Sequence, residues 1–386
     1  MDFELSEDQR AFAETARQFA QSELAPYAAK WDEEAIFPVD AIAKAGELGF
    51  CGLYAPENAG GLALPRLDTT LVFEELAAVD PSTTAFISIH NMATWMLGTW
   101  ATDAVRDEWG PLLTSGEKLA SYCLTEPGSG SDAASIKTRA ELQGSEYVIN
   151  GGKAFISGAG STDLLVLMAR TGDAGAGGIS AFAVPAQLPG ISYGKKEHKM
   201  GWNSQPTRTI SFDNVRIPAS HLLGREGEGF KIAMKGLDGG RINIATCSVG
   251  AAQGALTHAQ RYLQERKQFG KPLASFQALQ FKLADMATHL VAARQMVRLA
   301  ASKLDAGAAE ATTYCAMAKR FATDTCFDVI NEALQLHGGY GYLRDFPLER
   351  LLRDARVHQI LEGTNEIMRV IVGRRMLDGD APDAIR

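Results

Sequence analysis

A single acidic residue near the end of the chain, Glu362, stands where two predicted helices meet. Before it, apolar residues recur at helical spacing, namely Leu348, Leu351, Leu352, Ala355 and Ile360. The pattern stops at Glu362 and Gly363, and Thr364 or Asn365 can cap a second helix. Burial of a carboxylate on irregular backbone raises its pKa and makes it a candidate general base. A solvated glutamate in a loop is the alternative that this stretch alone leaves open.

Two segments earlier in the chain carry residue types that bind ligands. The run YCLTEPGSGSD at 122–132 leaves a predicted strand for a loop of glycine and serine, which exposes backbone N–H groups to an anion or a polar ring edge. A plain turn is the competing interpretation. The run DGGR at 238–241 places two glycines inside a predicted helix, which indicates either close approach of a ligand or another backbone, or a kink. Arg241 beside them can hold a phosphate or a purine.

Two later segments are rich in basic or glycine residues. The run RKQFGKPLASFQ at 266–277 joins two predicted helices, and its cations can bind a pyrophosphate at the start of the second helix or simply be solvated. The run QLHGGYGY at 335–342 ends a helix at a glycine pair. A left-handed helix cap at Gly338 or Gly339 explains the glycine pair. It does not explain Gly341 and the two tyrosines that follow. Neither a dinucleotide fingerprint nor a P-loop occurs in the sequence.

The elements that position these segments fall into three groups. Helical periodicity begins at a capping box, SEDQ at 6–9, and dominates an N-terminal all-helical domain, 1–117. Short β-branched and aromatic runs with turns at 150–151 and 172–178 then predict a middle antiparallel β domain, 118–225, because no long helix intervenes. Helical periodicity returns in a C-terminal four-helix bundle, 226–386, with helices expected over 230–263, 276–304, 310–336, 347–361 and 365–377. The fold class is therefore α+β and multidomain.

Composition excludes several classes of function. With 386 residues, 46% hydrophobic and 22% charged, the chain is an ordinary globular protein. A net charge of −8 argues against a nucleic-acid partner, and the absence of an apolar run of about 18 residues argues against membrane insertion. Five scattered cysteines without a C-x-x-C pair indicate reduced core residues. Seven dispersed histidines give no support for a metal site.

Taken together and in this order, the segments resemble the acyl-CoA dehydrogenase family over essentially the whole chain. The motifs that carry the resemblance are YCLTEPGSGSD, RKQFG, HGGYG and EGTNE. Within the family, the runs GWNSQPT at 201–207, GGRINIA at 239–245 and RVHQILEG at 356–363 are most similar to members that oxidise isobutyryl-CoA. The order of helices, strands and helices agrees independently with that fold.

The resemblance implies noncovalently bound FAD. Residues implied to line its isoalloxazine ring are Tyr122, Cys123, Leu124, Thr125, Ser131, Phe155, Ile156 and Ser157. Residues implied to reach the FAD of a neighbouring subunit are Arg266, Phe269, Phe276, Gln277, Gln335, Leu336, His337, Gly338 and Gly339. A further stretch at the cofactor comprises Thr364, Asn365 and Glu366. Phe155 stands where many members carry tryptophan.

The resemblance also assigns the chemistry. Glu362 removes the α-proton of a thioester while a hydride leaves the β-carbon for the flavin. The backbone N–H of the base and a hydroxyl of the FAD ribityl chain stabilise the enolate-like charge. Residues implied to contact acyl-CoA are Ser131, Asp238, Arg241, Gly363 and Arg374. One subset of the family carries its base at the position of Gly240, which cannot serve here.

The implied partners are an acyl-CoA, electron-transfer flavoprotein and three copies of the same chain in a homotetramer, a dimer of dimers. The expected reaction is oxidation of isobutyryl-CoA to methacrylyl-CoA in valine breakdown, in the bacterial cytoplasm or, for a processed eukaryotic chain, the mitochondrial matrix. Alternative substrates are 2-methylbutyryl-CoA and short straight-chain acyl-CoAs. A hydrophobic pocket discriminates between substrates by only about 1–3 kcal/mol of binding free energy per methylene, so the sequence does not decide among them. An acyl-CoA oxidase and a non-catalytic flavoprotein scaffold also stay open.

Overall fold

The chain begins with a helical layer, as the capping box predicts. The computed structural model describes residues 4–378. Ser6 Oγ accepts from Gln9 N and Gln9 Oε1 accepts from Ser6 N at the start of the first helix. The helices are α1 (Glu7–Phe19), continued by a π-helical turn (Ala20–Leu24), α2 (Ala28–Glu33), α3 (Val39–Glu47), α4 (Arg66–Ala77), α5 (Pro81–Trp100) and α6 (Asp103–Thr114). The expected N-terminal helical layer is confirmed.

A β sheet follows the helical layer. Its strands are β1 (Ala120–Cys123), β2 (Arg139–Gln143), β3 (Glu146–Ser157), β4 (Leu164–Arg170), β5 (Ile179–Pro185), β6 (Ile191–Tyr193), β7 (Thr207–Pro218) and β8 (Leu222–Leu223). They lie in the order β6-β7-β3-β2-β4-β5-β8, and β1 pairs with β4. The prediction of purely antiparallel strands is wrong at β1, which runs parallel to β4. A loop and the β2–β3 hairpin provide the long crossover that a parallel pair needs, so no helix is required.

The predicted turn at Asn150–Gly151 is also wrong, because β3 runs straight through it. Gly151 has φ +143°, and the register of β3 against β7 shifts between Ile149 and Gly151. A Cβ on Gly151 would lie 2.6 Å from Thr138 Cα. This glycine therefore serves a β-bulge in the pairing of β3 with β7 rather than a hairpin. The predicted turn at 172–178 does join the antiparallel strands β4 and β5.

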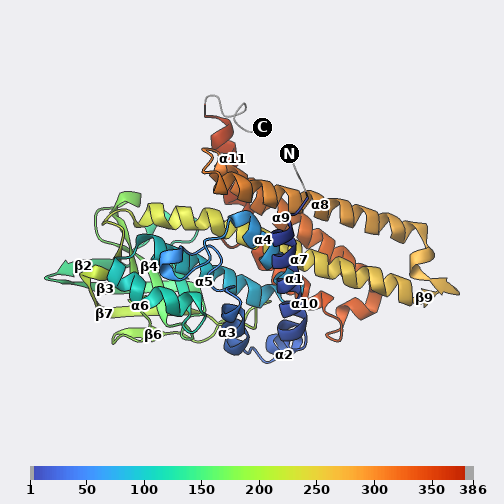
Figure 1. Cartoon of the computed structure of the whole chain (residues 1–386), viewed down its shortest axis with the longest axis horizontal. Helices are drawn as coiled ribbons and strands as arrows, with labels where there is room; N and C mark the ends of the chain where they lie inside the picture. Colours follow the sequence, from blue (N-terminus) through green and yellow to red (C-terminus); the bar gives the residue numbers. More distant parts are fainter. Residues whose placement is uncertain (1–3, 379–386) are drawn as a thin grey trace.

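The third layer is a helical bundle built on one long helix. Its elements are α7 (Gly229–Glu265), the short strands β9 (Lys267–Gln268) and β10 (Lys271–Pro272), α8 (Gln277–Asp305), α9 (Ala311–Leu336), α10 (Leu348–Arg356) and α11 (Asn365–Met376). In Figure 1, α7 crosses the molecule from the sheet towards the β9 end, where α8 and α9 accompany it. α7 packs on α9 and α8 within the bundle and on α4 and α5 outside it. The expected bundle is confirmed.

One hydrophobic cluster joins the sheet to the helices. It contains residues of α5 and α7 together with inward residues of β1, β4 and β5, such as Met92, Ile232, Ala120, Val166 and Ala183. Because these side chains exclude water between the layers, β1, β4 and β5 are held against α5 and α7. No helix within residues 4–378 is long and apolar enough to span a lipid bilayer.

Candidate active site

Glu362 lies in a break between two helices. α10 ends at Arg356 and is followed by a short 3₁₀ turn (Val357–Gln359). Glu362 and Gly363 then adopt φ +56° and +91°, the left-handed region that a glutamate seldom occupies. Thr364 Oγ1 accepts from Ile367 N, 3.3 Å, and caps α11. The backbone therefore reverses at Glu362, as the sequence pattern predicts, and directs its side chain towards α7.

The carboxylate of Glu362 is closed off from water. The residue as a whole is half-buried, but its Oε2 is inaccessible and has no hydrogen-bond partner among residues 4–378. A Cβ on Gly240 of α7 would lie 2.4 Å from that oxygen. Burial raises the pKa of Glu362 to about 7, against the opposing charges of Arg241 and Lys319. Glu362 therefore has the proton affinity that a general base working near neutral pH requires.

The glycine pair in α7 makes room for side chains. The helix continues without a break through Gly239 and Gly240. A Cβ on Gly239 would lie 2.5 Å from Arg66 Nη1, just as one on Gly240 would meet Glu362. Close approach, rather than a kink, explains both glycines, and the approaching groups are side chains of this chain.

Arg241 joins α7 to the loop of Glu362. Its Nη1 donates to Asp238 Oδ1 at 2.7 Å, and its Nε lies 3.4 Å from the carbonyl oxygen of Glu362. Thr312 Oγ1 at the start of α9 donates to Asp238 Oδ2 at 2.6 Å. The structure thus brings Asp238, Arg241 and Gly363 together beside the candidate base. Arg374 is exposed in the last turn of α11, and no hydrogen bond or ion pair within residues 4–378 joins it to this group.

Arg66 is a buried cation that the sequence did not reveal. Its guanidinium carbon lies 3.3 Å from the ring centroid of Tyr54 and 5.3 Å from that of Trp95. Its Nη1 is buried without a hydrogen-bond partner among residues 4–378. Tyr122 has a buried hydroxyl in the same condition, and burial together with the charge of Glu362 raises its pKa. Two unpaired polar groups and a carboxylate therefore gather around this part of α7.

The segment at 122–132 and the end of β3 lie side by side. Ala154 N donates to Thr125 O at 2.9 Å, and Ser121 Oγ donates to Ser157 O at 2.7 Å. Phe155 bulges out of the strand with φ +56° and 69% of its surface exposed. Ser131 is exposed in the neighbouring loop. An exposed aromatic ring on strained backbone is typical of a surface built to receive a ligand.

Lys153 fastens these two segments, and sequence reasoning missed it. Its side chain is fully buried, with Nζ 2.9 Å from Leu124 O and 2.7 Å from Glu126 Oε1. Glu126 also accepts from the backbone N–H groups of Lys137 and Thr138, at 2.6 and 3.0 Å. One buried ion pair therefore sets the path of the loop relative to β3.

The residues predicted to reach the FAD of a neighbouring subunit lie at the opposite end of the molecule, near β9 (Figure 1). A cavity of about 460 Å³ is lined there by Arg266 and by residues Gln335, Leu336, His337, Gly338 and Gly339. Gly338 has φ +59°, the left-handed cap that the sequence predicts. Phe269, 91% exposed, meets Phe276 edge to face, and Gln277 begins α8. The 25 helical steps of α7 from Gly240 to Glu265 separate this cavity from Glu362 by about 38 Å of helix.

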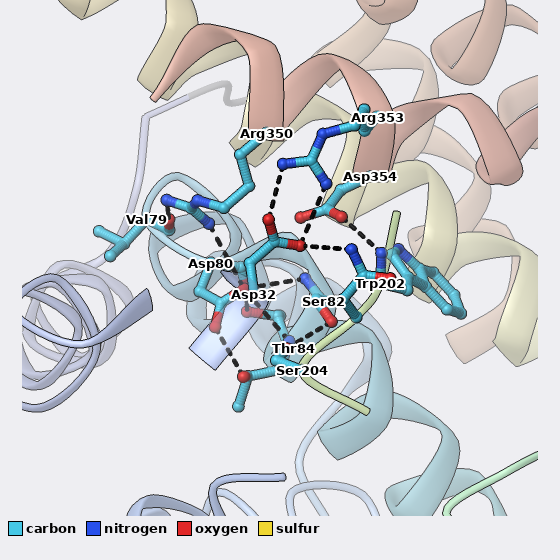
Figure 2. A network of polar contacts seen from close by, with 12 residues as sticks. Asp32, Val79, Asp80, Ser82, Thr84, Trp202, Ser204, Arg350, Arg353 and Asp354 are labelled. Atoms are coloured by element: carbon cyan, nitrogen blue, oxygen red, sulfur yellow. Dashed lines mark hydrogen bonds and ion pairs between the residues drawn. The ribbon is translucent and has the colours of Figure 1, made fainter. Parts of the chain in front are cut away.

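A network of polar contacts anchors α10 (Figure 2). Arg353 pairs with Asp32 of α2, and Asp354 Oδ1 accepts from Trp202 N at 2.6 Å. Trp202 Nε1 donates to His358 Nε2 at 3.3 Å, while Ser248 of α7 lies 2.8 Å from Nδ1. Burial lowers the pKa of His358 to about 3, so the ring is neutral. These contacts fix the backbone that leads into Glu362.

The chain thus has a helical layer, a β layer and a second helical layer, with a buried carboxylate held against the central helix α7. Models of the acyl-CoA dehydrogenase N-terminal, middle and C-terminal domains match residues 6–117, 121–215 and 227–377. The chain belongs to the acyl-CoA dehydrogenase family. It is therefore an FAD-dependent oxidoreductase that acts on an acyl-CoA.

Individual relatives agree with this membership. Mitochondrial isobutyryl-CoA dehydrogenase of Bos taurus is 53% identical over 97% of this chain and 90% of its own length. The structure of butyryl-CoA dehydrogenase from Megasphaera elsdenii superposes with a TM-score of 0.94 at 39% identity, covering 98% of this chain and 100% of that one. A chain in a structure of the electron transferring flavoprotein of Acidaminococcus fermentans reaches a TM-score of 0.95 at 41% identity, with coverage of 98% and 100%.

The residues present fit a flavin. The unpaired Tyr122 hydroxyl, the loop exposing backbone around Thr125 and the exposed ring of Phe155 suit a flat cofactor with a polar edge. Asn365 instead uses its side chain inside the protein, on Thr323, Asp324 and Lys319. No group of three or more histidine, cysteine, aspartate or glutamate side chains within 4–378 is arranged to hold a metal ion.

Proposed function

We propose that this protein oxidises isobutyryl-CoA to methacrylyl-CoA and passes the electrons to an electron-transfer flavoprotein. The observation that carries the proposal is the buried, unpaired carboxylate of Glu362, held against Gly240 with its pKa raised to about 7. The 53% identity to the bovine isobutyryl-CoA dehydrogenase supports the choice of acyl group. The likeness to a chain found with electron transferring flavoprotein supports the electron acceptor.

In the proposed reaction Glu362 takes the α-proton of the thioester. Burial makes this carboxylate a stronger base than a solvated one, and it accepts the proton only while ionised. Activity therefore falls as the pH drops below the pKa of Glu362. Asp238, Arg241 and Gly363 hold the acyl-CoA beside the base, with Ser131 and Arg374 contacting its more distant parts.

The flavin site is proposed on two groups of residues. Tyr122 to Thr125 and Phe155 to Ser157 hold the isoalloxazine ring, with Thr364 to Glu366 nearby. When bound, the cofactor supplies the acceptor for the hydride that leaves the β-carbon. The cavity at Arg266 and residues 335–339 lies about 38 Å of helix away from Glu362, so it serves the FAD of another subunit. We propose that the subunits assemble as a homotetramer, a dimer of dimers.

The free state of the cysteines agrees with an intracellular location. All five cysteines are free and buried, which suits a compartment that keeps thiols reduced. Relatives include both mitochondrial and bacterial proteins. We therefore propose the cytoplasm of a bacterium, or the matrix of a mitochondrion, as the place of action.

Anaerobic reduction of the bound flavin by isobutyryl-CoA tests the proposal. The wild-type protein bleaches its flavin absorbance, and Glu362→Gln slows the bleaching by about 10²–10⁴-fold because the amide cannot accept the proton. FAD content measured after gel filtration stays unchanged, since the amide fills the same space. Normal bleaching by the variant would contradict the role given to Glu362.

Comparison of kcat/KM for isobutyryl-, 2-methylbutyryl- and butyryl-CoA tests the acyl group. A preference for either of the last two would replace isobutyryl-CoA as the substrate but retain the dehydrogenase reaction.

A further inference from the structure

A second fully buried lysine, Lys319 in α9, forms hydrogen bonds to the loop that carries Glu362. Its relative exposure is 0%. Its Nζ donates to the carbonyl oxygen of Gly363 at 2.8 Å and to Asn365 Oδ1 at 2.8 Å. The lysine therefore holds the two residues on the C-terminal side of Glu362, one by its backbone and one by its side chain.

The next turn of α9 forms hydrogen bonds to residues on both sides of Glu362. Asp324 Oδ1 accepts from Asn365 Nδ2 at 2.7 Å and from Gln359 Nε2 at 2.9 Å. Thr323 Oγ1 accepts from the same amide of Asn365 at 2.9 Å. Since Gln359 precedes the base and Asn365 follows it, α9 fixes the entry and the exit of the left-handed turn at Glu362. Backbone in that region persists only where neighbouring groups determine it.

The ammonium group of Lys319 is not paired with a carboxylate within residues 4–378. No ion pair to it is formed within the part of the chain that the structure describes, and its two close acceptors are neutral. The charged groups that face it are Glu362 and Glu366 on the loop and α11, Asp324 on α9 and Arg241 on α7. A buried ammonium without a paired anion is expensive, so its retention beside the candidate base requires an explanation.

We propose that Lys319 is a positioning residue for the general base: it holds the left-handed turn in place and its positive charge favours the ionised form of Glu362. The inference rests on the proposed function, in which that ionised carboxylate takes the α-proton. Without Lys319, the turn would lose two hydrogen bonds and the carboxylate a neighbouring positive charge.

The direction of the electrostatic effect follows from the groups around both residues. Burial lowers the pKa of Lys319 to about 7, with Glu362 as the first opposing charge. Burial raises the pKa of Glu362 to about 7, and Arg241 and Lys319 oppose the rise. Tyr122 from β1 and Tyr54 also face the carboxylate. Loss of the ammonium therefore raises the pKa of Glu362, and proton abstraction then requires a higher pH.

The test is the pH profile of substrate-dependent flavin reduction in the FAD-loaded enzyme. Lys319→Met moves the acid limb to higher pH by about one unit, the lower end of the effect of a nearby opposite charge. Below the midpoint this shift corresponds to a rate about tenfold lower than that of the wild type. Lys319→Arg retains the charge and keeps the acid limb within a few tenths of a unit. An unchanged acid limb in folded, flavin-loaded Lys319→Met would overturn the proposal.

A measurement independent of turnover follows the proton itself. Infrared difference spectra of the protein over a pH series report the protonated carboxyl band of Glu362, assigned by its absence in Glu362→Gln. The midpoint of this band rises in Lys319→Met and stays in place in Lys319→Arg. If the methionine variant does not fold, Lys319→Gln carries the same test, because its amide keeps a donor for Gly363 O without a charge. A midpoint unchanged in the neutral variant would overturn the proposal as well.

Failure of this inference and of the proposed function give different results. If isobutyryl-CoA and the related thioesters do not reduce the wild-type flavin, the proposed reaction is wrong, although the infrared midpoints still report the Lys319 effect. If the wild type is reduced and the neutral Lys319 variants keep its pH profile, the reaction stands and the role of Lys319 is wrong.

Discussion

Two buried lysine–glutamate neighbourhoods occupy this molecule, and they differ in whether the lysine touches the glutamate. In the β layer, Lys153 donates directly to Glu126 at 2.7 Å. In the bundle, Lys319 donates to the backbone and side chain that follow Glu362, not to the carboxylate. Both lysines are almost completely buried. The pKa of the glutamate shifts in opposite directions in the two places, although the two residue types are the same.

The proton affinities show that difference. Burial alone would raise the pKa of Glu126, but Lys153 and backbone donors lower it below its usual value, so the carboxylate stays ionised. Burial raises the pKa of Glu362 to about 7, because its Oε2 has no donor and Lys319 acts only at a distance. A directly paired carboxylate makes a permanent anchor for the loop at 122–132. Glu362, whose neighbouring lysine binds the residues that follow it and not its carboxylate, can exchange a proton.

Lys153→Met is the largest expected disturbance. It leaves Glu126 buried without its cation and lowers the free energy of unfolding by about 3–5 kcal/mol, with loss of FAD. Urea unfolding and flavin content measure both effects. Adding Glu126→Gln to the same protein recovers part of the loss, because the uncompensated charge is then gone.

Lys319→Met leaves no ion-paired carboxylate behind and costs about 1–3 kcal/mol, because the buried carbonyl oxygen of Gly363 loses its donor while Asn365 Oδ1 still has Thr323 Oγ1 at 3.3 Å. Equal losses of stability in Lys153→Met and Lys319→Met would remove the distinction between the two neighbourhoods.

Gly240→Ala separates the position of Glu362 from its charge environment. The new methyl group would lie 2.4 Å from Oε2 and displaces the carboxylate while α9 and Lys319 are untouched. Misplacement of a reacting group by about 1 Å costs about 10²-fold, so we expect a loss of that size in the rate of flavin reduction. The free energy of unfolding changes little, because alanine favours the helix.

The matched control is Gly373→Ala in α11, where a Cβ meets nothing within 4 Å. It brings the same gain in helix propensity without a clash, and its rate stays near the wild-type value. A similar loss of rate in both variants would show that the clash at Glu362 is not the cause.

Periodicity and caps were sufficient to predict the three layers, the break at Glu362 and a helix cap at Thr364 or Asn365, of which the structure has Thr364. These features depend on residues close together in the sequence, where helix and turn chemistry is local. The bulge at Gly151 was mistaken for a turn because Asn-Gly suits both, and only pairing with β7 decides between them. The parallel pairing of β1 with β4 likewise depends on a partner about forty residues away.

The site was predictable where a motif names its residues and not where tertiary contacts create the role. Glu362, Asp238 and Arg241 were found from sequence and lie together. Lys153 and Lys319 look like ordinary lysines in a strand and a helix, because their burial and acceptors exist only after the layers pack. Arg66 gave no signal either, since its aromatic neighbours Tyr54 and Trp95 belong to other elements. The assignment of each residue to FAD or acyl-CoA stays a prediction.

Lys282→Met provides the smallest expected effect and completes the comparison. Lys282 of α8 pairs with Glu332, which lies on α9 like Lys319, but both side chains reach solvent, with 43% and 31% of their surface exposed. Solvent screens such a pair, so its removal lowers the free energy of unfolding by at most about 1 kcal/mol and leaves the acid limb of the pH profile unchanged. If Lys282→Met moved that limb as far as Lys319→Met, any cation on the bundle would act on Glu362 through a long-range field. The position of Lys319 beside the turn would then not be what sets the pKa of Glu362. In that case added salt would abolish the shift of the acid limb in both variants.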